Sequence, residues 1–233
     1  MERYSQDLSY SYSLGMSLTI EALLRRPEKV KEVVLSAKAN KNSQLDLLFE
    51  LCLKNKIAYR YDENFIRKLS VKENCYCIGV FEKFDTPVKG DRHVVLYGFN
   101  DFGELGTILR SAVAFDFEDI ILIDSKIDIF DPRCIRASMG SVFHIGLNRF
   151  DSIEEYKKAF PGFHIYPFVS DSDTQLNEAS FEEPYGLLIA QEYDSLDSMK
   201  EGICLMKGNK EEISLSIRSS IILEAAYDQK RRR

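Results

Sequence analysis

No stretch of this sequence approaches the roughly 18 to 20 uninterrupted apolar residues that a membrane-spanning helix needs. The first residues, MERYSQDLSYSYS, also lack the basic and then apolar layout of a secretory signal peptide. We therefore expect a cytoplasmic protein with no membrane partner.

Cysteine is scarce, with five residues scattered along the chain. Only Cys75 and Cys77 lie close together, and their one-residue spacing suits neither a zinc knuckle nor a redox pair. We expect reduced, mostly buried thiols and no metal site.

Basic charge is in deficit, because 37 acidic residues oppose 31 basic ones and give a net charge of -6. This balance argues against a protein that coats nucleic acid through a broad basic face. A local patch remains open around Arg25, Arg26 and Lys29 and in the tail YDQKRRR, although such runs are often simply solvated.

The length of 233 residues favours two domains. In the first, Met16, Ile20, Leu23 and Leu24 share a helical face, and KEVVLS follows as a strand. A helix over Leu45 to Cys52, a strand at IAYRY, a short helix at ENFIRKL and a strand at CYCIGVF complete a small α/β domain over 1–84. Pro87 and Gly90 mark a linker at about 85–91.

The second domain, 92–233, alternates apolar strands with helices. The predicted strands are HVVLY, IILID, VFHIG, FHIYPFV, GLLIA and GICLM. Helices are predicted after HVVLY, near DPRCIRA, near IEEYKKAF and, as a long last helix, from about Glu211. Strands that are apolar throughout predict a mostly parallel sheet covered on both faces, with ligands at the carboxyl ends of its strands.

The stretch FNDFGELGTILRSAVAFDFEDIILID, residues 99–124, therefore lies where a ligand site belongs. It is no Walker loop, because Gly106 is followed by Thr107 and not by lysine. Gly98, Gly103 and Gly106 match only the last interval of the dinucleotide fingerprint, and Asp101 and Glu104 would repel a pyrophosphate. A dinucleotide site is thus a weak alternative.

The same stretch resembles the first motif of the SpoU-type RNA ribose methyltransferases, DPGNLGTILRTAxAFGxxxIIL. The resemblance continues in order through IRASMGSVFHIGL, GLLIAQEYDSL, ICLMKG and ISLSIRSSIILEAAY, which are similar to RASxGAxFxxPx, LVLGNEGxGL, IPMxG and SLNVSxAxAILLYE. Residues 10–82 resemble the ribosomal-protein-like substrate domain of that family. Ordered motifs over nearly the whole chain are specific, whereas any one of them alone is not.

The resemblance implies a trefoil-knotted catalytic domain, a homodimer, S-adenosylmethionine as cofactor, and methylation of a ribose 2'-hydroxyl of tRNA or rRNA. Carried over, the cofactor-binding residues are Ala190, Gln191, Glu192, Leu205, Met206, Gly208, Ser214, Leu215 and Ser216. The catalytic candidates are Arg110, Glu192, Ser214 and Glu104. The RNA-binding candidates are Arg25, Arg26 and Lys29.

Methyl transfer from a sulfonium is an in-line displacement that needs alignment and stabilisation of a developing alkoxide. Because a guanidinium stays protonated in proteins, we assign Arg110 an electrostatic role and not that of a general base. The alternative for Arg110 is a local salt bridge to an acid such as Asp116.

Several positions depart from the family pattern, and they concentrate in the cofactor loops. Glu104 stands for asparagine, Ala190 and Tyr193 stand for glycines, Leu205 for proline, and Arg218 for the last serine of SLNVS. Two hypotheses follow: an active, divergent RNA 2'-O-methyltransferase, or a non-catalytic paralogue that binds RNA or a protein without methyl transfer.

Overall fold

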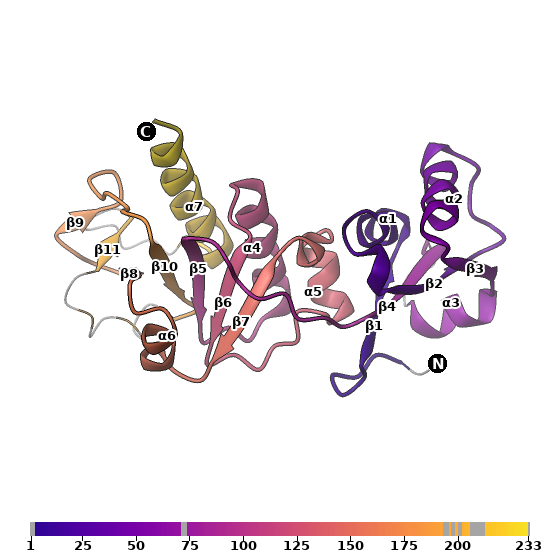
Figure 1. Cartoon of the computed structure of the whole chain (residues 1–233), viewed down its shortest axis with the longest axis horizontal. Coiled ribbons are helices and arrows are strands. Elements are labelled where there is room, and N and C mark those ends of the chain that lie inside the picture. The colour runs from indigo at the N-terminus through magenta and orange to yellow at the C-terminus, as the bar shows by residue number, and fades with distance from the viewer. Residues whose placement is uncertain are drawn as a thin grey trace. The chain divides into compact units, whose positions relative to one another are not determined.

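The computed structural model describes residues 3–70, 74–192, 196, 199, 202–205 and 213–232. Its internal contacts divide the chain into two units, shown in Figure 1. Unit 1 comprises Met1–Phe84 and Asp128–His144, and unit 2 comprises Asp85–Ile127 and Ile145–Arg233. We describe each unit by itself.

Unit 1 is built on a four-stranded mixed sheet with strand order β1-β4-β2-β3. β4 is antiparallel to β1 and β2, and β3 runs parallel to β2 at one edge. The elements are β1 (Tyr10–Leu14), α1 (Met16–Arg25), a 3-10 turn (Pro27–Lys29), β2 (Val30–Leu35), α2 (Ser43–Asn55), β3 (Ala58–Tyr61), α3 (Glu63–Leu69), β4 (Cys77–Glu82), α5 (Pro132–Ala137) and a second 3-10 turn (Ser141–Phe143).

The helices of unit 1 begin where the sequence supplies caps. Asn42 accepts a hydrogen bond from the Leu45 amide at the start of α2, and Asp62 accepts one from the Phe65 amide at the start of α3. Pro27 ends α1, as predicted from its missing N–H. Leu24, however, was expected on the buried face of α1 and is 51% exposed, so that expectation is wrong.

The segment Asp128–His144 packs within unit 1, although it is far from the first 84 residues in sequence. The Ser11 hydroxyl donates to the Phe130 carbonyl, and Arg26 Nε donates to the Phe143 carbonyl at 3.0 Å. His144 Nε2 and Glu21 Oε1 lie 2.5 Å apart. Part of the second resemblance motif therefore contributes to the core of the smaller unit.

Unit 2 holds a seven-stranded sheet with strand order β7-β6-β5-β10-β8-β11-β9. Its strands run parallel, as the sequence predicts. Its elements are β5 (Arg92–Tyr97), α4 (Phe102–Ala114), β6 (Asp119–Ile123), β7 (Gly146–Phe150), α6 (Ile153–Ala159), β8 (His164–Phe168), β9 (Thr174–Gln175), β10 (Tyr185–Ala190), β11 (Ile203–Cys204) and α7 (Leu215–Arg232).

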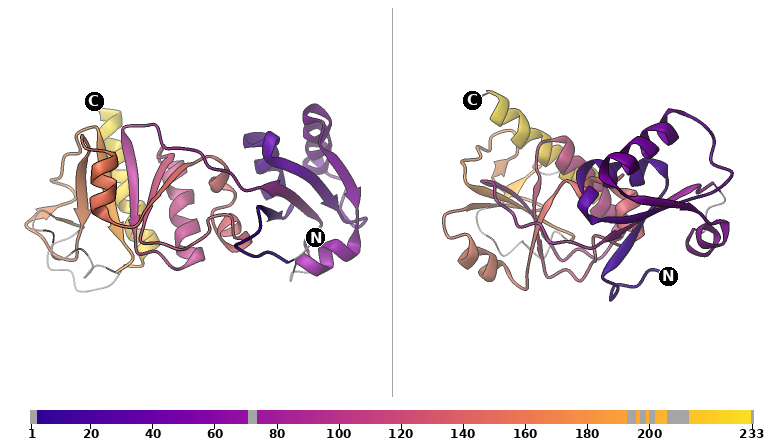
Figure 2. Two further views of the ribbon diagram at one scale, coloured as in Figure 1. Left: turned by 60° about the horizontal axis from the view of Figure 1, so that its bottom comes forward. Right: turned by 45° about the vertical axis from the view of Figure 1, so that its right-hand side comes forward.

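Both faces of this sheet carry helices. Tyr156 of α6 packs in one cluster with Val95, Ile121 and Leu188. Alternate strand residues point to the opposite face, where α4 and α7 lie side by side (Figure 2). The mixed α/β class with a parallel sheet is thus confirmed.

Three local predictions are corrected by the structure. VFHIG was expected to be a strand, but Ser141–Phe143 form a 3-10 turn and the strand is Gly146–Phe150. The last helix begins at Leu215 and not near Glu211, since Ile213 and Ser214 are not helical. The strand Tyr10–Leu14 was missed, because its serines interrupt the apolar pattern; they are nevertheless fully buried.

All five cysteines are free and buried, as predicted. Burial raises the pKa of Cys77 to about 12, so this thiol stays protonated at neutral pH. Within the described ranges, none of the helices combines the length and hydropathy that a membrane span requires.

Candidate functional site

The carboxyl edge of the unit 2 sheet holds several of the predicted cofactor-binding residues. β5, β10, β8 and β11 are neighbours in that order and run parallel, so their carboxyl ends meet along one edge. The loop that leads to α4 follows β5. Ala190 is the last residue of β10, Gln191 and Glu192 follow it, and Leu205 follows β11. Loops from three separate parts of the sequence therefore open at one place.

The first of these loops ends in a capped helix. Asp101 is the N-cap of α4 and accepts a hydrogen bond from the Glu104 amide at 2.7 Å. The helix N-terminus is thus satisfied by a carboxylate of the chain itself, which leaves it unsuited to a pyrophosphate. This agrees with the rejection of a phosphate cradle from the sequence.

The loops after β5 and β10 are joined by a reciprocal pair of hydrogen bonds. The backbone N–H of Asn100 donates to Gln191 Oε1 at 2.7 Å, and the side-chain Nε2 of Gln191 donates to Asn100 Oδ1 at 2.7 Å. The Gln191 amide also donates to the Tyr97 carbonyl at 3.0 Å. Gln191, a predicted cofactor residue, is therefore held in one orientation beside the start of α4.

Arg218 ties α7 to the end of β10. Its side chain lies in the interior, with the residue only 4% exposed, and Nη2 donates to the Ala190 carbonyl at 2.8 Å. The Arg218 backbone N–H donates to the carbonyl of Ser214, the residue that precedes α7. Sequence reasoning recorded Arg218 only as a departure from SLNVS and missed this contact; a long basic side chain in a run of small residues was the available signal.

Arg110 is exposed on α4. The neighbouring Ser111 hydroxyl lies 2.9 Å from that of Ser220, which fixes α4 against α7. Asp116, the proposed local partner of Arg110, instead contacts Arg92 at 3.1 Å and Lys230 at 2.8 Å. The hydrogen bond from Lys230, followed by that from Arg92, lowers the pKa of Asp116. The predicted alternative, a salt bridge between Arg110 and Asp116, is therefore wrong.

The cofactor-binding candidates and the catalytic candidate Glu104 differ in exposure. Ala190 and Leu215 are buried, Glu104, Gln191, Leu205 and Ser216 are half-buried, and Glu192 and Ser214 are exposed. Met206, Gly208 and Tyr193 lie outside the described residues.

The three RNA-binding candidates lie in unit 1, near the end of α1. Arg25 is exposed and lies 3.3 Å from Glu21. Arg26 is half-buried, with its guanidinium on the Phe143 carbonyl and 5.1 Å from the centre of the Phe84 ring. Lys29 is half-buried at the end of the first 3-10 turn. Of the three, Arg26 is the most engaged in packing.

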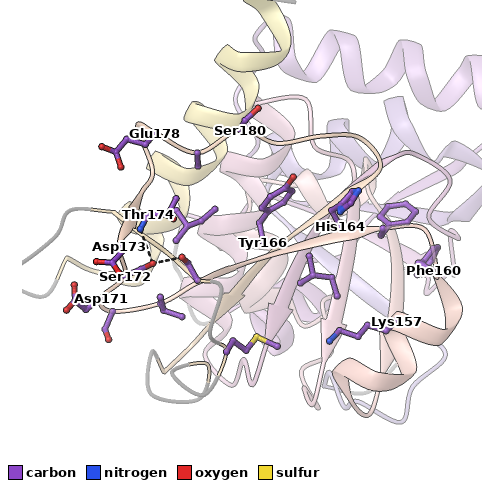
Figure 3. A pocket seen from close by; sticks show the side chains of 18 of the residues that line it. Lys157, Phe160, His164, Tyr166, Asp171, Ser172, Asp173, Thr174, Glu178 and Ser180 are labelled. Carbon is purple, nitrogen blue, oxygen red and sulfur yellow. Dashed lines mark hydrogen bonds between the residues drawn. The ribbon is translucent and has the colours of Figure 1, made fainter.

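A cavity of about 1210 Å³ lies beside β8, as Figure 3 shows. Lys157 and His164 line one part of it, and Asp171, Asp173 and Glu178 line another. Carboxylates repel RNA phosphates, so the cavity is not suited to the RNA backbone. In the described part of the chain, no cluster of His, Cys, Asp or Glu is arranged to hold a metal ion.

Comparison with known proteins supports the sequence motifs. Residues 91–204 match the model of the SpoU rRNA Methylase family. An uncharacterized tRNA/rRNA methyltransferase of Synechocystis is 24% identical over 59% of this chain and 38% of its own length. The 23S rRNA (guanosine(2553)-2'-O)-methyltransferase RlmP of Bacillus subtilis is 23% identical over 77% of this chain and 71% of its own length.

The fold also has solved counterparts. The SpoU methyltransferase AviRb of Streptomyces viridochromogenes, solved with AdoMet, has a TM-score of 0.75 over 95% of this chain and 91% of its own, at 20% identity. The chain spans only about two fifths of the Synechocystis relative, 38% of its length. Residues 91–204, which include β5, β8, β10 and β11 of the carboxyl edge, thus resemble the SpoU rRNA Methylase family.

Proposed function

We propose that this protein transfers a methyl group from S-adenosylmethionine to a ribose 2'-hydroxyl of tRNA or rRNA. The observation that carries the proposal is the carboxyl edge of a SpoU-type sheet, where Gln191 is tied to Asn100 and Ala190 to Arg218. Named relatives are 2'-O-methyltransferases of 23S rRNA, which supports the ribose as the target.

S-adenosylmethionine would lie against the loops after β10 and β11 and the start of α7. The described side chains fit such a ligand, because Ala190, Ser214 and Ser216 are small and Leu205 and Leu215 are apolar. Backbone groups can then approach the ligand closely despite the lost glycine. The cofactor would supply a methyl group on a positively charged sulfur.

Arg110 is our candidate for stabilising charge on the reacting oxygen or on the neighbouring phosphate. It is exposed on α4 and free of the Asp116 pairing. A fixed positive charge aimed at a developing alkoxide lowers the barrier without accepting a proton. Glu104, Glu192 and Ser214 are the further catalytic candidates; the two carboxylates can accept a proton, which Arg110 cannot.

We also propose the trefoil knot and the homodimer of the family for this chain. α4 and α7 leave an apolar groove of about 390 Å³, lined by Phe115, Ile217 and Ile221 among others. Ile217 is 55% exposed and Ile221 is 40% exposed. Two exposed isoleucines on α7, beside the packed helix α4, favour a second copy as their cover.

A non-catalytic RNA- or protein-binding paralogue is the second candidate, and Arg218 is the observation that favours it. A buried guanidinium on the Ala190 carbonyl brings positive charge to the loop that would hold a cationic sulfonium.

Two measurements distinguish the methyltransferase from the non-catalytic paralogue. The first is calorimetric titration with S-adenosylmethionine, and the second is tritium transfer from labelled cofactor to deproteinised rRNA and tRNA. Saturable cofactor binding and label on the 2'-oxygen are expected. Absence of cofactor binding would favour the paralogue, and label on a base would overturn the ribose assignment.

A further inference from the structure

Unit 1 exposes a row of aromatic and apolar side chains along α2 and β3. This aromatic strip consists of Phe49 and Leu53 on α2 and Tyr59 and Tyr61 on β3. Leu53 is 83% exposed, Tyr59 is 49% exposed and Tyr61 is 57% exposed. Large apolar side chains gathered on one surface mark an interaction site more often than single ones do.

The rings of the strip are ordered by their own contacts. Tyr59 and Tyr61 are two residues apart on a strand and share one face, with ring centres 6.4 Å apart and planes at 85°. Phe49 packs against Tyr59 at 4.9 Å between ring centres. Two χ angles per ring and these mutual contacts keep the cost of ordering low when a ligand binds.

The residue between the tyrosines shows that the strip is not part of the core. Arg60 contacts Glu32 at 3.0 Å and lies 5.0 Å from the centre of the Phe65 ring, on the α3 side of the sheet. Phe65 belongs to the buried cluster there, together with Tyr12, Ile78 and others. Tyr59 and Tyr61 therefore face the opposite side, next to α2, where they remain open to solvent.

Charge is distributed unevenly around the strip. Lys54 and Lys56 are exposed where α2 ends and the chain enters β3. Asp46 and Glu50 are exposed farther back on α2. A polyanion would therefore place its phosphates at the lysine end, with its bases along the tyrosines.

We propose that the aromatic strip binds unpaired RNA bases by stacking, with Lys54 and Lys56 holding the adjacent phosphates. This inference rests on the proposed function for its ligand class, but it concerns a surface apart from the predicted Arg25, Arg26 and Lys29 patch. Flat rings beside lysines fit bases better than they fit the aliphatic side chains of a protein partner. Binding is expected to favour single strands over duplexes, in which the bases are stacked already.

The probes are a fluorescent 12-nucleotide oligouridine and a 12-base-pair RNA duplex, titrated with the full chain. Tyr59→Ala/Tyr61→Ala should weaken oligouridine binding by about tenfold or more and leave duplex binding unchanged. Tyr59→Phe/Tyr61→Phe should retain affinity, because the ring and not the hydroxyl stacks. Lys54→Ala/Lys56→Ala should flatten the salt dependence. Tyr76→Ala, at a 36% exposed tyrosine outside the strip, is the matched control.

Equal affinity of the double alanine variant and the parent would overturn the proposal, and so would an equal loss in Tyr76→Ala. Unchanged RNA binding with lost attachment to ribosomal particles would assign the strip to a protein and overturn it too. S-adenosylmethionine binding, measured by calorimetry on the same variants, should stay unchanged. A failure of the proposed function would appear in that measurement and not in the oligouridine titration.

Discussion

The two units present their functional surfaces by different means. In unit 2 the candidate site consists of loops at the carboxyl edge, held by polar contacts such as Asn100–Gln191 and Arg218–Ala190. In unit 1 the candidate surface consists of exposed rings on regular elements, Tyr59 and Tyr61 above all. The first kind of surface has a motif in the sequence and the second has none. A motif search therefore finds the candidate site of unit 2 more readily than it finds the exposed tyrosines of unit 1.

The largest effect should come from the exposed charge of Arg110 on α4. Arg110→Ala is expected to lower methyl transfer by about 10² to 10³-fold, as does loss of one group that stabilises a transition-state charge. S-adenosylmethionine affinity should stay nearly unchanged, because our proposal assigns Arg110 to the acceptor and not to the cofactor. Single-turnover label transfer and calorimetry measure the two. Asp116→Ala is the matched control, since Asp116 contacts Arg92 and Lys230 instead; an equal loss in the control would remove Arg110 from the mechanism.

The next effect concerns the apolar surface of unit 2. Ile217→Asp/Ile221→Asp should convert the proposed dimer to a monomer, because two carboxylates cannot be buried unpaired at an interface. Sedimentation velocity at micromolar concentration measures the change. Leu24→Asp, at an exposed leucine of α1 in unit 1, is the control and should leave the assembly intact. A monomeric parent protein would contradict the assignment of this groove.

Arg218→Ala should destabilise unit 2 by about 1–3 kcal/mol, because the Ala190 carbonyl loses its buried donor. The stability of Arg218→Lys should fall between that of the parent and that of Arg218→Ala, since lysine keeps the charge but not the planar guanidinium. Urea unfolding measures the loss, and Ser219→Ala in the same helix is the control.

Cofactor calorimetry on the Arg218 variants sharpens the choice of function. Weaker binding in Arg218→Ala than in a control of equal stability makes Arg218 a residue that positions the Ala190 loop. Tighter binding in Arg218→Ser, the residue of the family motif, would show that the guanidinium obstructs the ligand and would favour the non-catalytic paralogue.

The sequence predicted the sheet of unit 2 well because parallel strands buried on both faces read as continuous apolar runs, as in IILID and GLLIA. It failed at VFHIG, where Val142 and Phe143 are buried in a 3-10 turn, since burial does not distinguish turn from strand. The pairing of Gln191 with Asn100 was beyond reach, because it joins residues 91 positions apart. The open tyrosines were also missed, as alternation in IAYRY does not reveal which face a helix covers.

The smallest effect concerns pH and the buried histidine His93 in unit 2. His93 of β5 is fully buried, lies 3.0 Å through Nδ1 from the Tyr156 hydroxyl, and stacks on Phe163. Burial lowers the pKa of His93 from 6.5, although the Asp119 and Asp91 carboxylates oppose the shift. The unfolded chain therefore binds this proton more readily than the folded chain does. The contribution of neutral His93 to the free energy of unfolding should be fully present above pH 6.5. Below pH 6.5 it should fall by at most about 1.4 kcal/mol per pH unit, until the pH reaches the lowered pKa of the folded protein. Urea unfolding at pH 7.5, 6.0 and 5.0 should show a steeper loss for the parent than for His93→Phe, which removes the titrating group and keeps a ring in the Phe163 stack. Parallel profiles would mean that His93 already binds its proton in the folded protein.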